Sequence, residues 1–204
     1  MQPPPLEMEA PTRRRPRALD ALIEIATTIA LAIVLYVVIQ TFVVQTYRVE
    51  QQSMQATLQP NQHLLIDKLT PRFDDYSRGD IIVFHPPPDA GEGDTPYIKR
   101  VIAVGGEHVQ IKRGAVWVNG VKLDEPYVNK DGDTEADGDQ TTWDVPIGSL
   151  FVLGDHRSQS TDSRAFGFVP VDSVIGRAWL RFWPLNTLTL IQTPVYPNVP
   201  ASAP

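Results

Sequence analysis

The chain has 204 residues, enough for one anchor and one domain of about 150 residues. Its 18 basic and 24 acidic residues give a net charge of −6, which argues against a nucleic-acid-binding surface. It has no cysteine, which excludes disulfides, thiol catalysis and cysteine-based metal sites.

The N-terminal part combines a basic tail with a long apolar run. Residues 1–20 are rich in proline and then in arginine (Arg13, Arg14, Arg15 and Arg17), and we expect a disordered cytoplasmic tail. The apolar residues that follow would form a helix of about 35 Å, long enough to cross a hydrocarbon core of about 30 Å. The pattern predicts a transmembrane helix over residues 21–45.

Two other interpretations of this run fit less well. A cleaved signal peptide has a shorter apolar core and a small-x-small site after it, whereas here Gln45-Thr46-Tyr47-Arg48 follows. A buried helix of a globular domain would be shorter or more amphipathic. The arginines before the run predict a single-pass protein of the inner (plasma) membrane, with its N-terminus in the cytoplasm and everything from Tyr47 onward outside.

Residues 46–192 have the pattern of a mainly β domain. Short apolar runs alternate with Pro, Gly and Asp, and Asn119-Gly120 is a strong hairpin signal. We expect a folded-over sheet or a barrel-like arrangement. The predicted strands are His63–Lys68, Asp80–His85, Tyr97–Val104, Val109–Lys112, Ala115–Val118, Val121–Leu123, Leu150–Leu153 and Val174–Phe182.

Two segments of this part are predicted to be irregular. Residues 129–140 form an acidic insertion whose Asp133, Glu135, Asp137 and Asp144 loosely resemble a calcium loop. Because the pattern is imperfect and has no flanking helices, we interpret it as a solvated loop and predict no metal site. The Pro- and Ala-rich residues 193–204 are predicted to be a disordered tail.

Ser53 and Lys99 are the candidate catalytic residues. Ser53 follows the apolar run closely, but a serine hydroxyl is a poor nucleophile until a neighbour accepts its proton. In the predicted strand Tyr97–Val104, alternation places Tyr97, Lys99, Val101 and Ala103 on one face and the other four residues on the opposite face. Burial among apolar neighbours would lower the pKa of Lys99 toward that of a general base, although a lysine at a strand edge could also extend its amine to solvent.

Other polar groups are weaker candidates. His63, His85, His108 and His156 are scattered, without triad or metal-ligand spacing. The segment 154–164 gathers charges and hydroxyls after an apolar strand. It could orient catalytic groups, or it could be a turn that faces solvent.

Four motifs in this order resemble the type I signal peptidases, the leader peptidases of the S26 serine–lysine family. Behind the anchor, Ser53-Met54-x-x-Thr57-Leu58 resembles the nucleophile box and Tyr97–Val101 the box that carries the lysine. The other two are Arg78–Phe84 and the segment 154–164, which reads GDHRSQSTDSR. The resemblance extends to about Pro184.

The resemblance implies a role for each matching residue. Ser53 would be the nucleophile and Lys99 the general base, and Ser160 would hydrogen-bond and orient the lysine amine. The oxyanion would be held by the Ser53 N–H and by Gln51, which stands where the family usually has Ser or Gly; Ala56 replaces the usual proline. The residues expected to support the site are Asp162, Arg164, Arg100 and Asp155.

The implied fold is the mostly-β, coiled-sheet fold shared with the self-cleaving repressors. The implied reaction removes signal peptides from exported precursors after a small-x-small site through an acyl-enzyme. Met54 and Tyr97 are candidate substrate-binding residues in shallow apolar pockets. No cofactor is expected, and the expected partners are signal peptides and membrane lipid, with the protein a monomer.

Two alternatives remain at this stage. The departures at Gln51 and Ala56 motivate a non-catalytic, membrane-anchored member of the fold that acts as a binding or assembly subunit. A narrower enzymatic alternative is a peptidase with a few dedicated substrates, such as transfer or pilus proteins.

Overall fold

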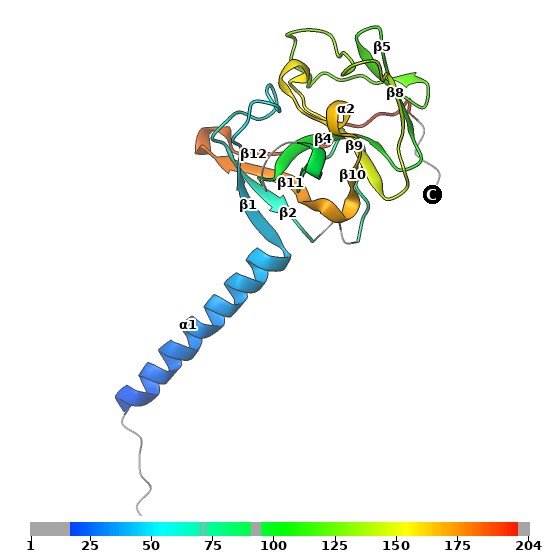
Figure 1. Ribbon diagram of the computed structural model, residues 1–204. Coiled ribbons are helices and arrows are strands. Elements are labelled where there is room, and N and C mark those ends of the chain that lie inside the picture. The colour runs from blue at the N-terminus through cyan, green and yellow to red at the C-terminus, as the bar shows by residue number, and fades with distance from the viewer. Residues whose placement is uncertain (1–16, 70, 72, 91–94, 200–204) are drawn as a thin grey trace, which may run out of the picture. The chain divides into compact units, whose positions relative to one another are not determined.

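The computed structural model describes residues 17–69, 71, 73–90 and 95–199, and the chain forms two compact units, residues 1–40 and 41–204. Helix α1 spans Arg17–Phe42 (Figure 1). It starts four residues before the predicted span, because Arg17–Asp20 are helical, and it ends three residues before residue 45. The predicted tail otherwise lies outside the described residues. The apolar part, Ala18–Phe42, has 25 residues and is long enough to cross a membrane.

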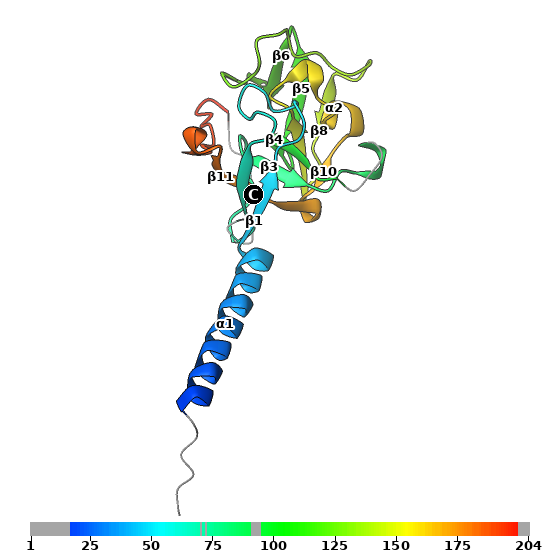
Figure 2. The same cartoon turned by 90° about the vertical axis from the view of Figure 1, so that its left-hand side faces the viewer.

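The second unit is mainly β, as predicted, and consists of two antiparallel sheets (Figure 2). The larger sheet has the strand order β1-β2-β11-β3-β4-β9-β10, with β12 paired to β11, and the smaller has the order β7-β6-β5-β8. The smaller sheet lies at the end of this unit opposite β1 (Figures 1 and 2). The strands are β1 Val44–Arg48, β2 His63–Asp67, β3 Ile81–Phe84, β4 Tyr97–Val104, β5 His108–Lys112, β6 Ala115–Val118, β7 Val121–Lys122, β8 Thr142–Asp144, β9 Ser149–Leu153, β10 Val169–Pro170, β11 Val174–Trp183 and β12 Thr189–Leu190.

Every predicted strand is present with small shifts at its ends, and β4 and β6 have the predicted bounds. Asn119 and Gly120 both have positive φ (50° and 80°), as the two-residue hairpin between β6 and β7 requires. The prediction missed β1, β8, β10 and β12. Three of these have two or three residues, too short to show a period, and the first two residues of β1 fall within the predicted helix.

The face alternation predicted for β4 is wrong beyond Val101. The register with β9 shifts between Val101 and Ala103, which is the mark of a bulge. Val104 therefore packs in the same cluster as Tyr97 and Val101, not on the opposite face. Lys99 precedes the irregularity, so its predicted placement is unaffected.

Three apolar clusters form the core of this unit. One combines residues of β4 and β9 in the larger sheet with residues of β5, β6 and β8 in the smaller sheet, and it includes Ile102, Trp143 and Phe151. A second, around Met54, Leu58 and Ile98, fills the space beneath the segment that carries Ser53. The third is built on β3, β4 and β9. All of their members come after residue 46.

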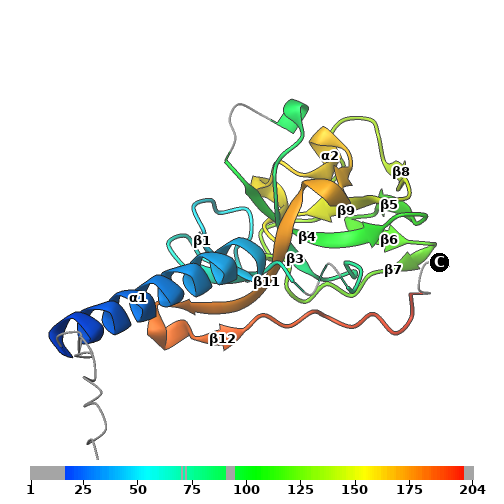
Figure 3. The same cartoon turned by 90° about the horizontal axis from the view of Figure 1, so that it is seen from below.

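The C-terminal segment is packed on the domain, and the prediction of a disordered tail is wrong for residues 193–199. Residues 193–199 run along the domain after β12 (Figure 3). Thr193 Oγ1 donates to the Asp80 carboxylate at 2.7 Å, and Val199, only 9% exposed, belongs to the core. Composition suggested disorder, but a few apolar and hydroxyl side chains find partners far back in the chain. Residues 200–204 of that tail lie outside the described residues.

Candidate active site

Ser53 and Lys99 lie together inside the larger unit. Strand β4 holds Lys99, and Ser53 lies in the turns between β1 and β2. Lys99 Nζ is 2.8 Å from Ser53 Oγ and 3.2 Å from the carbonyl oxygen of Ile98. Ser53 is 3% exposed and Lys99 1%. The sequence left open whether the Lys99 amine is buried or extends to solvent. In the structure it is buried and in hydrogen-bond contact with the Ser53 hydroxyl.

Burial changes the acid–base character of the lysine. Desolvation of the ammonium lowers the pKa of Lys99 from 10.5 to about 8. The carboxylates of Asp162 and Asp155 oppose this shift, and the Arg164 guanidinium adds to it. A substantial fraction of Lys99 is thus neutral near pH 8, where its lone pair can accept the proton of Ser53.

The segment that carries Ser53 is closed at its base and filled from below. Val49 N–H donates to Gln62 O, and Asn61 N–H donates to Val49 O, so the two ends are joined. Met54 and Leu58 point into the core and are almost completely buried. Met54, at 0% exposure, therefore supports the serine from beneath, and its expected contact with substrate stays a prediction.

The loop after β9 touches Ser53 through its backbone. His156 N–H donates to Ser53 O at 3.0 Å. A Cβ placed on Gly154 would lie 2.5 Å from the same carbonyl oxygen and 2.3 Å from Ser160 Oγ. Only glycine allows this approach. The sequence signal was a Gly directly after an apolar strand, and its role was not recognised.

The structure differs from the predicted Ser160–Lys99 hydrogen bond. Ser160 Oγ is buried and has no hydrogen-bond partner among the described residues. Ser53 Oγ and Ile98 O are the groups that Lys99 Nζ contacts. Ser160 lies against Gly154, where an added Cβ would also meet Ser53 O, but the lysine amine is turned toward Ser53 Oγ.

Asp162 and Arg164 hold this loop together. Asp162 is fully buried; it accepts the Gly154 N–H at 3.0 Å and caps the short helix α2 (Ser163–Phe166). Arg164 pairs with both Asp162 oxygens, at 2.8 and 2.9 Å, and also donates to the carbonyl oxygens of Arg157 and Ser160. These two residues fix the loop that touches Ser53.

Arg100 and Asp155 form a second buried pair. Two parallel hydrogen bonds, 2.8 and 2.7 Å long, join the guanidinium to the carboxylate, the strong bidentate geometry. Asp155 also accepts the hydroxyl of Thr57, four residues after Ser53. Sequence reasoning gave no role to Thr57, or to Tyr127, whose ring lies 3.9 Å from the Arg100 guanidinium. No local pattern marks Tyr127.

Tyr97 and Gln51 flank the pair. The Tyr97 hydroxyl donates to Ala90 O at 3.0 Å, and its ring is 5.1 Å from Lys99 Nζ, so it forms part of the lysine's surroundings. Gln51 is exposed beside the buried Ser53.

The acidic insertion contacts the loop after β9 through several residues, among them Asn129, Thr134 and Glu135. Asp131 accepts from His156 Nε2 at 2.5 Å and from the hydroxyl of Ser158. Across the part of the chain that the structure describes, no group of three or more His, Asp or Glu side chains is placed to hold a metal ion.

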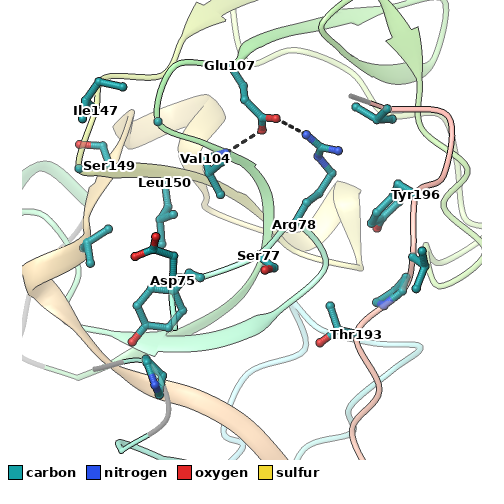
Figure 4. Close-up of a pocket in the computed structure, with 18 residues that line it drawn as sticks. Asp75, Ser77, Arg78, Val104, Glu107, Ile147, Ser149, Leu150, Thr193 and Tyr196 are labelled. Atoms are coloured by element: carbon teal, nitrogen blue, oxygen red, sulfur yellow. Dashed lines mark hydrogen bonds and ion pairs between the residues drawn. The ribbon is translucent and has the colours of Figure 1, made fainter. Parts of the chain in front are cut away.

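A cavity of about 810 Å³ lies elsewhere in the same unit (Figure 4). Arg78, Glu107, Leu150 and Tyr196 are among its walls, and neither Ser53 nor Lys99 is. Arg78 and Glu107, which form an ion pair, both line this cavity (Figure 4).

The chain is similar to proteins of one kind. The family model described as "Signal peptidase, peptidase S26" matches residues 22–183. A signal peptidase I of Leptolyngbya laminosa is 40% identical over 192 residues, covering 92% of this chain and 91% of that protein. Signal peptidase IB of Staphylococcus aureus is 34% identical, covering 81% and 91%. A crystal structure of a signal peptidase I from Enterococcus faecalis has 37% identity and a TM-score of 0.40, covering 51% of this chain and 97% of that one.

The family match covers residues 22–42 of the apolar helix and every candidate site residue from Gln51 to Arg164, and it ends at Trp183, before β12 and the C-terminal segment. Its length and the identity of the relatives leave no ambiguity about descent. The chain belongs to the signal peptidase family, peptidase S26.

Proposed function

We propose that this protein is a membrane-anchored serine peptidase that removes signal peptides, with Ser53 as nucleophile and Lys99 as general base. Family membership and the curated relatives named signal peptidase I support the reaction. The single observation that carries the residue assignment is the 2.8 Å contact between Lys99 Nζ and Ser53 Oγ in a buried site.

The mechanism follows from this contact. Neutral Lys99 accepts the Ser53 proton as Oγ attacks the scissile carbonyl, and Lys99 then returns that proton to the leaving amine. Water, activated by the same amine, releases the acyl group. The alternative of a non-catalytic subunit is not favoured, because a buried lysine kept only for binding would cost stability without benefit.

The oxyanion would be held at the same turn. The Ser53 N–H makes no hydrogen bond among the described residues, so it is free to donate to a developing oxyanion. We assign the second donor to the Gln51 side chain, which is exposed next to Ser53. Gln51→Ala should then lower kcat by about tenfold or more, with KM little changed.

One experiment tests the assignment of the two catalytic residues. The full chain in detergent is incubated with a precursor whose apolar core ends in Ala-x-Ala. We expect cleavage after the second alanine, complete loss in Ser53→Ala and Lys99→Ala, and normal cleavage in the controls Ser173→Ala and Lys122→Ala. The rate should rise with pH around a midpoint near 8, the pKa of Lys99. Full activity of Lys99→Ala, or a midpoint near 10, would refute the proposed base.

We further propose that α1 crosses the plasma membrane with the arginine-rich N-terminus in the cytoplasm, and that the protein acts as a monomer without nucleic acid. The chain has no cysteine, so single cysteines can report its orientation. In intact spheroplasts, a membrane-impermeant maleimide should label Asp139→Cys and not Ala10→Cys. The opposite labelling would reverse the orientation.

A further inference from the structure

The segment of residues 192–199, called here the C-terminal strap, is attached to the catalytic domain at several points. Thr193 Oγ1 donates to Asp80 at 2.7 Å, and Val199 is buried in the core. Pro194 packs so closely on Gly79 that a Cβ there would lie 2.9 Å from Pro194 Cδ. Between these points, Tyr196 reaches the interior and also lines the cavity (Figure 4).

The hydroxyl of Tyr196 enters a directed chain of hydrogen bonds. It lies 2.7 Å from the Tyr127 hydroxyl, which is 3.0 Å from the Glu125 carboxylate. Burial raises the pKa of both tyrosines, so each phenol keeps its one proton. Because a carboxylate only accepts, the Tyr127 proton goes to Glu125, and Tyr196 must donate to Tyr127.

Tyr127 connects this chain to the catalytic site. Its ring lies against the Arg100 guanidinium at 3.9 Å, a cation–π contact in a desolvated place. The same guanidinium holds Asp155 through two hydrogen bonds, and Asp155 accepts the Thr57 hydroxyl. Thr57 belongs to the turn that carries Ser53.

His156, the residue after Asp155, connects the same loop to Ser53 a second time. Its N–H donates to Ser53 O at 3.0 Å. A shift of Arg100 would therefore move Ser53 from two sides, through Thr57 and through His156. Displacements of this kind, of about 1 Å, can cost a hundredfold in rate.

We propose that Tyr196 is a positioning residue for the reaction at Ser53. The strap sets the orientation of Tyr127, Tyr127 holds Arg100 in place, and Arg100 with Asp155 fixes the turn that carries the nucleophile. This inference rests on the proposed function. Tyr196 touches no reacting atom, so its loss lowers kcat and leaves KM nearly unchanged.

The test is a double-mutant cycle in the full chain, with the Ala-x-Ala precursor as substrate. Tyr196→Phe removes only the donor to Tyr127, and it should lower kcat about threefold, the effect of one hydrogen bond, with KM within about twofold of the original. Tyr127→Phe should lower kcat at least as much. The double variant should equal Tyr127→Phe, because Tyr196 acts through Tyr127.

Val195→Ala is the matched control, because that side chain is 85% exposed on the same strap; its kcat should equal that of the original chain. An unchanged kcat in Tyr196→Phe, or decreases that multiply in the double variant, would overturn the inference. A decrease in kcat that disappears when the assay is run well below the unfolding temperature of the variant would also overturn it, because partial unfolding would then explain the loss. If Ser53→Ala or Lys99→Ala stays active, the proposed function fails; if both are inactive and Tyr196→Phe is normal, only this inference fails.

Discussion

At the scale of single residues, Lys99 shows the conflict between stability and chemistry. The side chain is 1% exposed, and desolvation lowers its pKa to about 8. Below that pH the folded protein must either keep an ammonium in a poorly solvated place or give up the proton. The same burial that suits Lys99 to the proposed role of base at neutral pH therefore destabilises the fold.

Replacing Lys99 by methionine should stabilise the protein in a pH-dependent way. The folded pKa is lower than the unfolded one, so the unfolded chain binds more protons between pH 8 and 10.5. The destabilisation of the fold by Lys99 is therefore complete below pH 8 and disappears as the pH rises to 10.5. We expect Lys99→Met to raise the free energy of unfolding by on the order of 2 kcal/mol at pH 7.

Chemical denaturation in detergent between pH 7 and 10.5 measures this difference, with the exposed Lys122→Met as control. The tyrosines titrate identically in both proteins and cancel. A difference that is constant with pH, or a destabilised Lys99→Met, would contradict the linkage.

At the scale of elements, the order of strands assembles the site. Strand β4 lies between β3 and β9, and Arg100 is the partner of Leu153 across the β4–β9 pair. The loop that begins at Gly154, directly after β9, therefore lies beside Lys99 and Arg100. Two ion pairs with fully buried carboxylates, Arg100–Asp155 and Asp162–Arg164, then hold that loop against Ser53. Removing one member of such a pair strongly destabilises the fold, since it leaves a buried charge without its partner.

Gly154→Ala tests how closely this loop must approach Ser53. The new Cβ would lie 2.5 Å from Ser53 O and 2.5 Å from Ser160 Cβ, so the loop must move. We expect kcat/KM to fall by on the order of a hundredfold, measured with the Ala-x-Ala precursor.

The double variant Gly154→Ala/Ser160→Ala serves as the control. It removes the Ser160 Oγ contact but leaves the contacts with Ser53 O and Ser160 Cβ, so activity should not return. Recovery in the double variant would mean that the serine hydroxyl, and not the backbone approach, limits this position.

At the scale of the whole molecule, the two units have separate tasks. The three apolar clusters of the larger unit use only its own residues, which is the condition for independent folding. The site residues described above all belong to the larger unit. Under the proposed function the contribution of the apolar helix would be to keep the enzyme and a membrane-held precursor on one surface, which raises their effective concentration.

A chain of residues 41–204 should separate these contributions. On a short Ala-x-Ala peptide its kcat should stay within about twofold of the full chain, whereas cleavage of a precursor in liposomes should slow by about tenfold or more. Equal losses on both substrates would show that the helix also shapes the active site.

Some features follow from the sequence because their causes are local. The apolar run, the strand Tyr97–Val104 and the Asn119-Gly120 turn each depend on neighbouring residues, and the structure has all three. The order of the motifs was enough to indicate the family and to single out Ser53 and Lys99.

The tertiary structure alone decided the features that join distant residues. The β4 bulge, the burial of Met54, the unpaired Ser160 hydroxyl and the attachment of residues 193–199 were all missed or misjudged. Thr193 and Asp80 are 113 positions apart, and Tyr127 and Tyr196 are 69 apart. No period or composition encodes such pairs, because they form only when the packed sheets bring the segments within hydrogen-bond distance.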